Sequence, residues 1–308
     1  MRTAVIVPTA GRMAKLARCL DGLYDMDEAP DEVIVVFQGP EDRAMTDAVR
    51  ARHPDTVVVW ASKRGAAAAR NAGAARTHAD LLLFVDDDCV VHPRWLGCYR
   101  SAFAEDERLM FASGRVSPLD GGHVASVGVG LQLGSVPRLF DQLANPVGTV
   151  DRSGNLAVRR SAFAALGGFD EGLGAGTAFP SAEDTDFVYR AMRAGFRLRY
   201  LPDAAVDHDQ WRSGSEASAL ERGYAIGLGA FLITHVRRGD AYAAGLVGRL
   251  AWHLGVRPLV AGTIQRRPDR RRSGWHYLVG IPMGMARGIR RPAEHHAGRA
   301  EDVPTGRR

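Results

Sequence analysis

The sequence predicts an α/β fold in which a mostly parallel central sheet is flanked by helices and followed by a C-terminal helical extension. Two observations support this prediction. Short apolar runs such as residues 81–85 alternate with segments of helical spacing through the first half of the chain, and these runs are apolar throughout rather than alternating with polar residues. Strands of that kind are buried on both faces, as in a parallel sheet covered by helices on each side.

The elements of the first half can be justified in order. A β-branched run predicts the first strand at 5–7, and Pro8 is expected to end it. The first helix should begin near Met13, because apolar side chains then recur with helical spacing. The remaining expected elements are strand 32–37, helix 43–52, strand 56–60, helix 66–77 and strand 81–85.

The second half is less regular. Residues 114–150 contain many glycines without a clear period, so a strand and a long loop are expected there. The pattern returns with a helix at 160–166, a helix at 183–194 and a strand at 197–201. Residues 213–291 are expected to form helices interrupted by glycine and proline, and the last fifteen or so residues, which are polar, to be disordered.

The composition is that of a globular protein with one large domain and an appendage, or with two domains. The 308 residues are 46% hydrophobic and 24% charged, which excludes collagen-like, disulfide-scaffold and wholly disordered classes. The formal charge of +5 is uneven, because residues 211–308 contain 17 arginines and 7 acids whereas the first 210 residues contain 23 basic and 28 acidic side chains. We therefore expect a domain boundary between residues 212 and 213. The basic region lacks interleaved aromatic residues, so no nucleic-acid partner is expected.

Cysteine usage and hydropathy bear on the compartment. The three cysteines form no Cys-x-x-Cys pair, and a strand-like run follows the first Met directly, so we expect a cytoplasmic protein with unpaired thiols and no secretory signal. No run of 18 apolar residues occurs, so a membrane span is not expected. Residues 274–288, with Arg287, Arg290 and Arg291 behind them, suit peripheral contact with an anionic membrane face, or simple packing as a helical appendage.

The strongest single chemical signal is the run of three carboxylates Asp86, Asp87 and Asp88 directly after a buried strand. Adjacent carboxylates repel one another unless a cation lies among them. In an extended segment Asp86 and Asp88 point the same way, so they could share one hard divalent cation. A nucleoside diphosphate leaving group needs such a cation. The alternative is a solvated acidic turn.

Three further segments admit both a functional and a structural interpretation. The small residues of 64–71 and the start of a helix favour an anion such as pyrophosphate, or else they form an alanine-rich packing helix. Glu183 and Asp184 begin another helix, with Ser181 available as its cap. They could supply a general base, or they could only offset the helix dipole. His208 is either a metal ligand or a surface histidine.

Taken together, these segments resemble the family-2 inverting glycosyltransferases over roughly residues 3–210. The resemblance rests on VIVPTAGR from Val5, EVIVV from Glu32, RGAAAARNAGAARTHADLLLFVDDD from Arg64, GNLAVRRSAFAALGGFDE from Gly154, EDTDFVYRAMRAGFRLRYLP from Glu183, and His208. It implies a GT-A fold, a nucleotide-sugar donor and a divalent metal, Mn²⁺ or Mg²⁺. Residues 1–212 would then be the catalytic domain, with about 1–115 binding the nucleotide sugar and about 116–212 forming the acceptor side.

The resemblance also implies a role for each matching residue. Asp184 matches the catalytic base, with Glu183 beside it. Asp86 and Asp88 match an Asp-x-Asp pair, directed towards the ribose and the metal, and both could contact the metal together with His208. The implied donor-binding residues are Pro8, Thr9, Arg12, Gln38, Arg64, Gly65, Arg70, Asn71, Asp86, Asp87 and Asn155.

Two departures from the family pattern leave the nucleotide open. The family usually places an aspartate that binds the base after its second strand, whereas this chain has Phe37-Gln38-Gly39-Pro40 there. Gln38 could still hydrogen-bond a base edge through its amide. Arg64 replaces a small or polar residue and adds a cation near the expected phosphates.

The function expected from the sequence is metal-dependent, inverting transfer of a sugar from a nucleotide-sugar donor to an acceptor hydroxyl. The acceptor would be a glycan, a lipid-linked molecule or a small-molecule glycoside, handled in the cytoplasm or at the inner face of the membrane. One alternative is a GT-A scaffold that binds nucleotide sugars without activity of its own. A dinucleotide-dependent oxidoreductase is disfavoured, because residues 7–11 do not supply the Gly-x-Gly-x-x-Gly that it requires.

Overall fold

The computed structural model describes residues 1–119, 131–140, 154–209 and 214–291. Its strands are β1 (Thr3–Thr9), β2 (Glu32–Gln38), β3 (Val57–Ala61), β4 (Leu81–Val85), β5 (Cys89–Val91), β6 (Leu109–Pro118), β7 (Arg138–Phe140), β8 (Asn155–Arg159) and β9 (Arg197–His208). Its helices are α1 (Met13–Tyr24), α2 (Arg43–Arg52), α3 (Ala66–Arg76), α4 (Trp95–Glu105), α5 (Arg160–Ala165), α6 (Glu183–Arg193), α7 (Gly214–Arg237), α8 (Ala241–Leu250), η2 (Ala251–Val256, a π-helical turn), α9 (Arg257–Ile264) and α10 (Pro268–Gly288).

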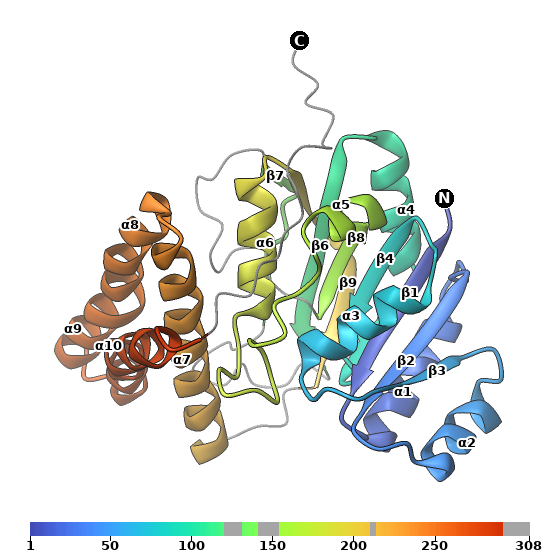
Figure 1. Ribbon diagram of the computed structural model, residues 1–308, viewed down its shortest axis with the longest axis horizontal. Helices are drawn as coiled ribbons and strands as arrows, with labels where there is room; N and C mark the ends of the chain where they lie inside the picture. Colours follow the sequence, from blue (N-terminus) through green and yellow to red (C-terminus); the bar gives the residue numbers. More distant parts are fainter. Residues whose placement is uncertain (120–130, 141–153, 210–213, 292–308) are drawn as a thin grey trace.

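All the described strands belong to one sheet, in the order β3-β2-β1-β4-β8-β6-β9-β5, with β7 paired to β9 (Figure 1). Strands β3, β2, β1 and β4 are parallel, and the antiparallel β8 joins them to the parallel pair β6 and β9. The carboxyl ends of β1, β2 and β4 therefore meet at one edge of the sheet. In open α/β sheets this edge is where ligands bind.

Helices cover both faces of the sheet, which confirms the predicted fold class. Side chains of α1, α2 and α4 form one core cluster with the sheet, and those of α3, α5 and α6 form the other. The alanine-rich helix α3 lies unusually close to the sheet, because a Cβ atom at Gly73 would come within 2.5 Å of Ile6 Cγ2. The packing interpretation of this helix is therefore correct at its sheet-facing side.

The structure extends or adds several elements relative to the prediction. Strand β1 continues through Pro8, which is tolerated because β4 pairs with β1 only as far as Ile6 and leaves that side of Pro8 without a ladder. Strand β9 continues past residue 201 to His208, where it pairs with β5. Helix α4 and strands β5 and β8 were not predicted. The two strands are short, whereas the helical spacing of Trp95, Tyr99 and Phe103 could have indicated α4.

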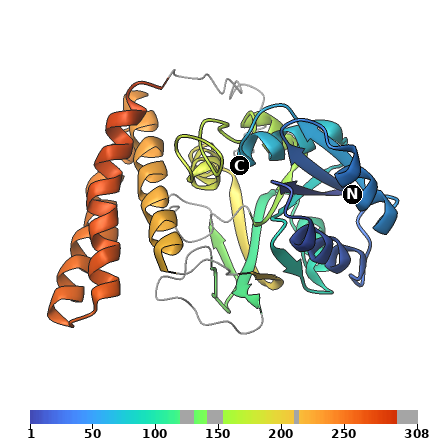
Figure 2. The same ribbon diagram turned by 90° about the horizontal axis from the view of Figure 1, so that it is seen from below.

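The C-terminal helices pack on the α/β unit through α7. Helix α10 runs alongside α7 (Figure 2), and a third core cluster joins these helices to Phe179, Ala182 and Tyr189 of the α/β unit. No helix in the described ranges is long and apolar enough to cross a membrane. The predicted disordered tail and most of the loop expected within 114–150 lie outside the described residues.

Candidate active site

The three carboxylates lie at the turn between β4 and β5. Part of the positive charge that offsets their mutual repulsion comes from an arginine of the chain itself. The Arg12 guanidinium, just before α1, pairs with Asp87 and donates from Nη1 to Asp88 Oδ2 at 2.8 Å. Thr9 Oγ1 donates to Asp87 Oδ2 at 2.6 Å. Burial raises the pKa of Asp87 even though its contacts with Arg12 and Thr9 act in the opposite direction. Asp87 is thus held firmly within the protein, beneath the edge of the sheet.

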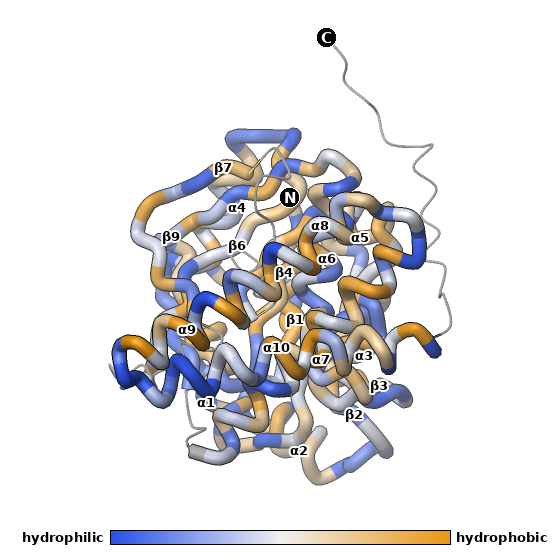
Figure 3. Tube along the Cα trace, turned by 90° about the vertical axis from the view of Figure 1, so that its left-hand side faces the viewer, coloured by the Kyte–Doolittle hydropathy of each residue, from blue (hydrophilic) through white to orange (hydrophobic). Residues whose placement is uncertain are grey.

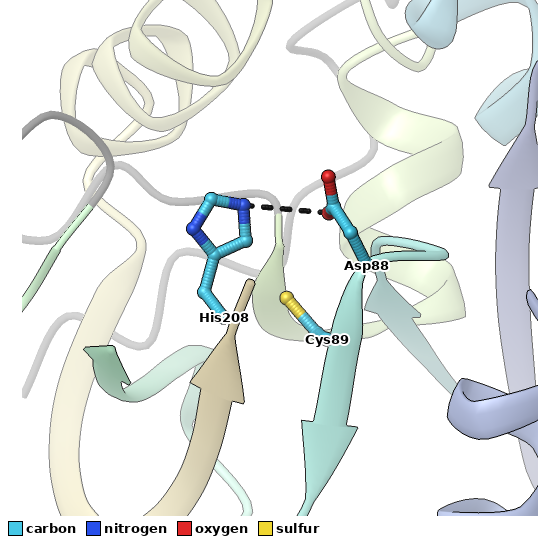
Figure 4. Close-up of side chains that lie close together, drawn as sticks. All are labelled: Asp88, Cys89 and His208. Carbon is cyan, nitrogen blue, oxygen red and sulfur yellow. Dashed lines mark ion pairs between the residues drawn. The ribbon is translucent and has the colours of Figure 1, made fainter. Parts of the chain in front are cut away.

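Asp88 lies beside His208, as Figure 4 shows. The pairing of β5 with β9 places His208 opposite Cys89, and Asp88 Oδ1 is 3.4 Å from His208 Nε2. Potential ligand atoms of Asp88, Cys89 and His208 all lie within 4.8 Å of one another. Burial opposes ionisation of Asp88, but the contact with His208 and the charge of Arg12 outweigh it and hold the pKa of Asp88 well below its usual value.

Two of the three residues in this cluster, Asp88 and His208, have side chains that suit a hard divalent cation. A carboxylate oxygen and an imidazole nitrogen are ligands for Mn²⁺ and Mg²⁺. Burial raises the pKa of the Cys89 thiol well above its usual value, so the thiol stays neutral. Asp86 is absent from this cluster, because its carboxylate is turned towards Arg70. The expectation that Asp86 and Asp88 converge on one cation is therefore not met in this structure.

Arg70 of α3 connects the two acidic segments of the sequence. Its buried guanidinium donates from Nη2 to Asp86 Oδ1 at 2.7 Å and from Nη1 to Glu183 Oε1 at 3.1 Å. It also lies over the ring of Phe169, 5.6 Å from the ring centroid. Although burial alone would lower the pKa of Arg70, the charges of Asp86 and Glu183 outweigh that effect and raise it. The segments around residues 86 and 183 thus form one site.

Asp184 lies in the first turn of α6, next to the Arg70 cluster. Its Oδ1 accepts a hydrogen bond from the backbone N–H of Thr185 at 2.8 Å, and the side chain is less buried than that of Glu183. The predicted cap is wrong. Ser181 Oγ lies 3.3 Å from the carbonyl oxygens of Gly223 and Tyr224, to which it donates, and α6 begins instead after Ala182 with φ of +75°.

The predicted anion site at the start of α3 is not open in this structure. The backbone N–H of Ala66 donates to the carbonyl oxygen of Ala175 at 3.0 Å, and that of Gly65 donates to Gln38 Oε1 at 2.8 Å. Gly65 has φ of +125°, and Gly176 packs so closely that a Cβ atom there would be 3.2 Å from Gly65 Cα. Gln38 Oε1 is thereby engaged within the protein.

Asn155 does not line an open sugar site. It is fully buried in β8, where its Oδ1 accepts from Trp95 Nε1 at 2.8 Å and from the Tyr99 hydroxyl at 2.7 Å. Its Nδ2 donates to the carbonyl oxygens of Arg115 and Ala204. These four bonds use the whole hydrogen-bonding capacity of the amide. The role in donor binding that the resemblance implied is therefore replaced by a structural one.

Three other predicted donor-binding residues differ in their burial and contacts. Pro8 is buried in β1, so its side chain acts through packing. Asn71 holds the chain after α5, because it exchanges hydrogen bonds of 2.9 Å with the backbone of Phe169 in both directions. Arg64, by contrast, is exposed beside the start of α3.

The glycine-rich loop 170–182 between α5 and α6 was not predicted from the sequence. A Cβ atom at Gly174 would lie 2.8 Å from the carboxyl carbon of Glu183, so the loop covers that acid. Arg291 anchors the loop from beyond α10 by donating to Asp170 Oδ1 at 2.7 Å. The density of glycines between two helices could have indicated the loop, whereas no local signal in the sequence pairs residues 170 and 291.

A comparison with known proteins identifies the family. The model of the family described as glycosyltransferase-like family 2 matches residues 1–223. The chain belongs to the family-2-like glycosyltransferases. The chain is 30% identical over 210 residues to the pre-mycofactocin glycosyltransferase of Mycobacterium tuberculosis. This match covers 67% of this chain and 42% of the relative. The chain thus spans about two fifths of the length of that curated relative.

Solved structures of other glycosyltransferases share the fold of this chain. The mannosyltransferase PcManGT from Pyrobaculum calidifontis, in complex with GDP-Man and Mn²⁺, matches with a TM-score of 0.61 and 21% identity, covering 94% of this chain and 87% of that one. Glucosyl-3-phosphoglycerate synthase from Mycobacterium tuberculosis, with Mn²⁺, UDP and phosphoglyceric acid, matches with a TM-score of 0.53 and 18% identity, covering 74% and 77%. The fold is GT-A, as the family resemblance implied.

Proposed function

We propose that the chain is a metal-dependent, inverting glycosyltransferase that moves a sugar from a nucleoside-diphosphate donor to an acceptor hydroxyl. One observation carries the proposal. Arg70 holds Asp86 and Glu183 together, and these two acids are close in sequence to Asp88, which lies beside His208, and to Asp184. The family match and the complexes of PcManGT and glucosyl-3-phosphoglycerate synthase support a nucleotide donor.

The divalent cation of this proposal, Mn²⁺ or Mg²⁺, would be held by Asp88 and His208. Support comes from the proximity of a carboxylate and an imidazole, 3.4 Å apart at their nearest atoms, because both groups are ligands for such an ion. When bound, the cation supplies Lewis-acid stabilisation of the charge on the departing diphosphate. We do not include Asp86 among its ligands, because that carboxylate pairs with Arg70.

In this proposal Asp184 is the general base. Its carboxylate accepts the proton of the acceptor hydroxyl while that oxygen forms a bond to the anomeric carbon, and the bond from that carbon to the diphosphate oxygen breaks. The nucleoside diphosphate leaves with the electron pair, and the single displacement inverts the anomeric configuration. Arg70 neutralises Glu183, so the more accessible Asp184 is the acid that remains for this step. The exposed Arg64 would offset phosphate charge.

We place the reaction in a reducing compartment, the cytoplasm, with a glycan, lipid-linked or small-molecule acceptor and peripheral contact at the inner membrane face. The cysteines at positions 19, 89 and 98 support a reducing compartment, because all of them are free thiols. Gln38 stands where the family usually has an aspartate that binds the base, and its Oε1 accepts a hydrogen bond from the backbone N–H of Gly65.

The test is the variant Asp184→Asn, with release of nucleoside diphosphate and donor binding measured separately. We expect release to fall by about 10²–10⁴-fold, the usual contribution of a general base, while binding of donor and Mn²⁺ is retained. Asp203→Asn, which changes an exposed acid in β9, is the matched control and should leave both unchanged. Normal turnover by Asp184→Asn would remove Asp184 from the role of base.

A second candidate is a nucleotide-sugar-binding scaffold without transfer activity. The observation that favours it is the Arg12 guanidinium, which already pairs with Asp87 and Asp88 and could reduce the need for a metal. A scaffold of this kind would bind nucleotide sugars equally well with and without Mn²⁺ and would release no nucleoside diphosphate with any acceptor.

A further inference from the structure

Helices η2–α9 and α10 pack side by side in opposite directions at the outer side of the C-terminal helices, farthest from the sheet (Figure 1). A Cβ atom at Gly255 would lie 2.7 Å from Leu278 Cδ2, and one at Gly262 would lie 2.5 Å from the backbone nitrogen of Arg271. As the residue number rises on one helix it falls on the other, so the pair is antiparallel. The glycines allow this close packing without covering the outer side of either helix.

The outer side of this pair carries large apolar side chains. Residues 252, 256, 260 and 264 recur every fourth position and therefore lie on one side of the helical run. Ile264 is 77% exposed, and Trp252 and Val260 are also exposed. On α10, Trp275 is 59% exposed and Val279 follows it one turn later. Figure 3 shows the molecule from the side on which this pair lies, where hydrophobic and hydrophilic positions of α9 and α10 occur next to one another.

Arginines gather at the end of the same surface. The turn joining α9 to α10 and the first turn of α10 contain Arg266, Arg267, Arg270, Arg271 and Arg272, with Asp269 as the one acid of residues 249–272. All five arginines are exposed. Within the described ranges, no hydrogen bond or ion pair is found for the side chains of Arg266, Arg271 and Arg272, or of Arg257 on α9. Their charge is thus available to an anionic partner.

This surface differs from the segment that the sequence suggested for membrane contact. Ile281 is buried against α7, and Leu278 packs on Gly255. Arg291 is half-buried and tied to Asp170. Much of the apolar side of residues 274–288 therefore holds the helices together, and the exposed apolar residues lie mainly elsewhere.

We propose that the α9–α10 face docks on the surface of an anionic lipid bilayer. We define this face by its apolar and basic residues, which are Trp252, Val256, Val260, Ile264, Trp275, Val279, Arg257, Arg266, Arg267, Arg270, Arg271 and Arg272. Valine and isoleucine side chains enter the boundary of the acyl chains, tryptophan rings lie at the level of the headgroups, and the arginines bind lipid phosphates. This proposal rests on the peripheral membrane contact of the proposed function and names the surface that makes it, but it does not depend on the transfer reaction.

The combination of groups favours a bilayer over two other occupants. A second copy of this face would bring like charges together, since the segment 249–272 carries seven arginines and one acid. A nucleic acid would satisfy the arginines but would leave Val260 and Ile264 against phosphates or water. A bilayer with anionic headgroups satisfies both the apolar and the basic side chains.

The test uses the full chain and vesicles of phosphatidylcholine alone or mixed with phosphatidylglycerol. We expect the chain to co-sediment with the mixed vesicles, to bind the neutral ones far less, and to be released by added salt, because salt screens the arginine charges. Tryptophan emission should shift to the blue on binding, and lipids brominated near the headgroup should quench it. The triple variant Arg266→Gln/Arg271→Gln/Arg272→Gln should lower the partition coefficient on the order of 100-fold, at about fivefold per arginine.

The apolar part of the face is tested by the double variant Ile264→Ser/Trp275→Ser, which should weaken partition and reduce the blue shift. The matched controls are Arg43→Gln/Arg50→Gln/Arg76→Gln and Val136→Ser/Leu139→Ser, which change exposed residues of the α/β unit and should bind like the wild type. Thermal unfolding of each variant verifies its fold. Quenching of tryptophan emission by brominated lipids is measured on the wild type, so this part of the test does not depend on whether a variant folds.

The proposal is overturned if the wild type does not bind anionic vesicles, or if the control variants lose as much binding as those on the face. It is also overturned if the Ile264→Ser/Trp275→Ser variant abolishes a dimer without changing vesicle binding, which would assign the face to a second copy. Displacement from vesicles by an RNA oligonucleotide that binds the same arginines more tightly would assign it to nucleic acid. Nucleotide binding and product release report on the transferase proposal separately.

Discussion

Arg70 is the residue that joins the two acidic segments of the site. It is buried between Asp86 and Glu183, and its guanidinium also makes a cation–π contact with the Phe169 ring. Removing a buried charge leaves its partners uncompensated, which costs more than the pair itself contributes. Arg70 therefore has a structural role in the candidate site.

We expect Arg70→Leu to lower the free energy of unfolding by about 3 kcal/mol, because Asp86 and Glu183 lose their shared cation while Glu183 stays mostly buried. Urea unfolding at neutral pH measures the effect. Arg76→Leu changes an exposed arginine of the same helix and should alter stability by no more than about 0.5 kcal/mol. Equal losses in the two variants would show that the Arg70 bridge contributes nothing specific.

Helix α6 is held to α7 by a buried ionic contact at Asp186. Its Oδ2 accepts from Arg190 Nε at 2.7 Å, and its Oδ1 is 2.8 Å from His235 Nε2 on α7. Burial would raise the pKa of Asp186, but the charge of Arg190 and the hydrogen bond with His235 outweigh it and lower that pKa below its usual value. The element that carries Asp184 is therefore fixed from its far side by the C-terminal helices.

The lowered pKa predicts a pH dependence of stability. A carboxylate whose folded pKa lies below its unfolded value of about 3.9 stabilises the fold above that pH and loses this contribution as the pH falls towards the folded value. Asp186→Asn should thus destabilise the chain by about 3 kcal/mol at neutral pH, and its difference from the wild type should narrow below about pH 4. Urea unfolding across that range measures the difference. A gap that is constant with pH would contradict the ionic contact.

Helices α7 and α10 pack closely through glycines. A Cβ atom at Gly284 would lie 2.0 Å from the carbonyl oxygen of Ile226 on α7. Gly248 on α8 has no atom within 4 Å of the same position, although it too lies in a helix. The two glycines therefore have different reasons to be present.

We expect Gly284→Ala to destabilise the protein by about 1–3 kcal/mol, because α7 and α10 must move apart to admit the methyl group. Gly248→Ala should instead stabilise it by about 0.5–1 kcal/mol, since alanine loses less backbone entropy in a helix. Thermal unfolding of the two variants gives the comparison. A loss of the same size at both positions would indicate a general effect of helix glycines and not the close packing described here.

At the scale of the whole molecule, the periodicity of the chain predicted the parallel half of the sheet and its helices, and hence the carboxyl ends of the strands where the candidate site lies. It could not predict the hydrogen bonds that connect distant segments. Asn155 and Ser181 were assigned to a sugar site and a helix cap, whereas they bond to backbone groups brought to them by other elements. Such partners depend on tertiary packing, which local residue patterns do not encode.

The pairing of charged residues was likewise not predictable from local residue patterns. The sequence separated an acidic first part from a basic C-terminal part, and three adjacent aspartates indicated a cation nearby. Only the structure shows that Arg12 and Arg70 supply much of that positive charge, so that Asp88 alone of the three is paired with His208. The basic part likewise contains both an internal contact, at Arg291, and an exposed surface between α9 and α10.

Metal-dependent binding of the donor is tested by a thermal-shift series with nucleotide sugars, with and without Mn²⁺, on the wild type, Asp88→Asn and His208→Ala. At a ligand concentration one hundred times its dissociation constant, the wild type should gain about 2.7 kcal/mol of stability. We predict this gain for a nucleoside-diphosphate sugar only when Mn²⁺ is present, and its loss in both variants. Stabilisation that is the same without Mn²⁺ and in both variants, or that no nucleotide sugar produces, would contradict the account.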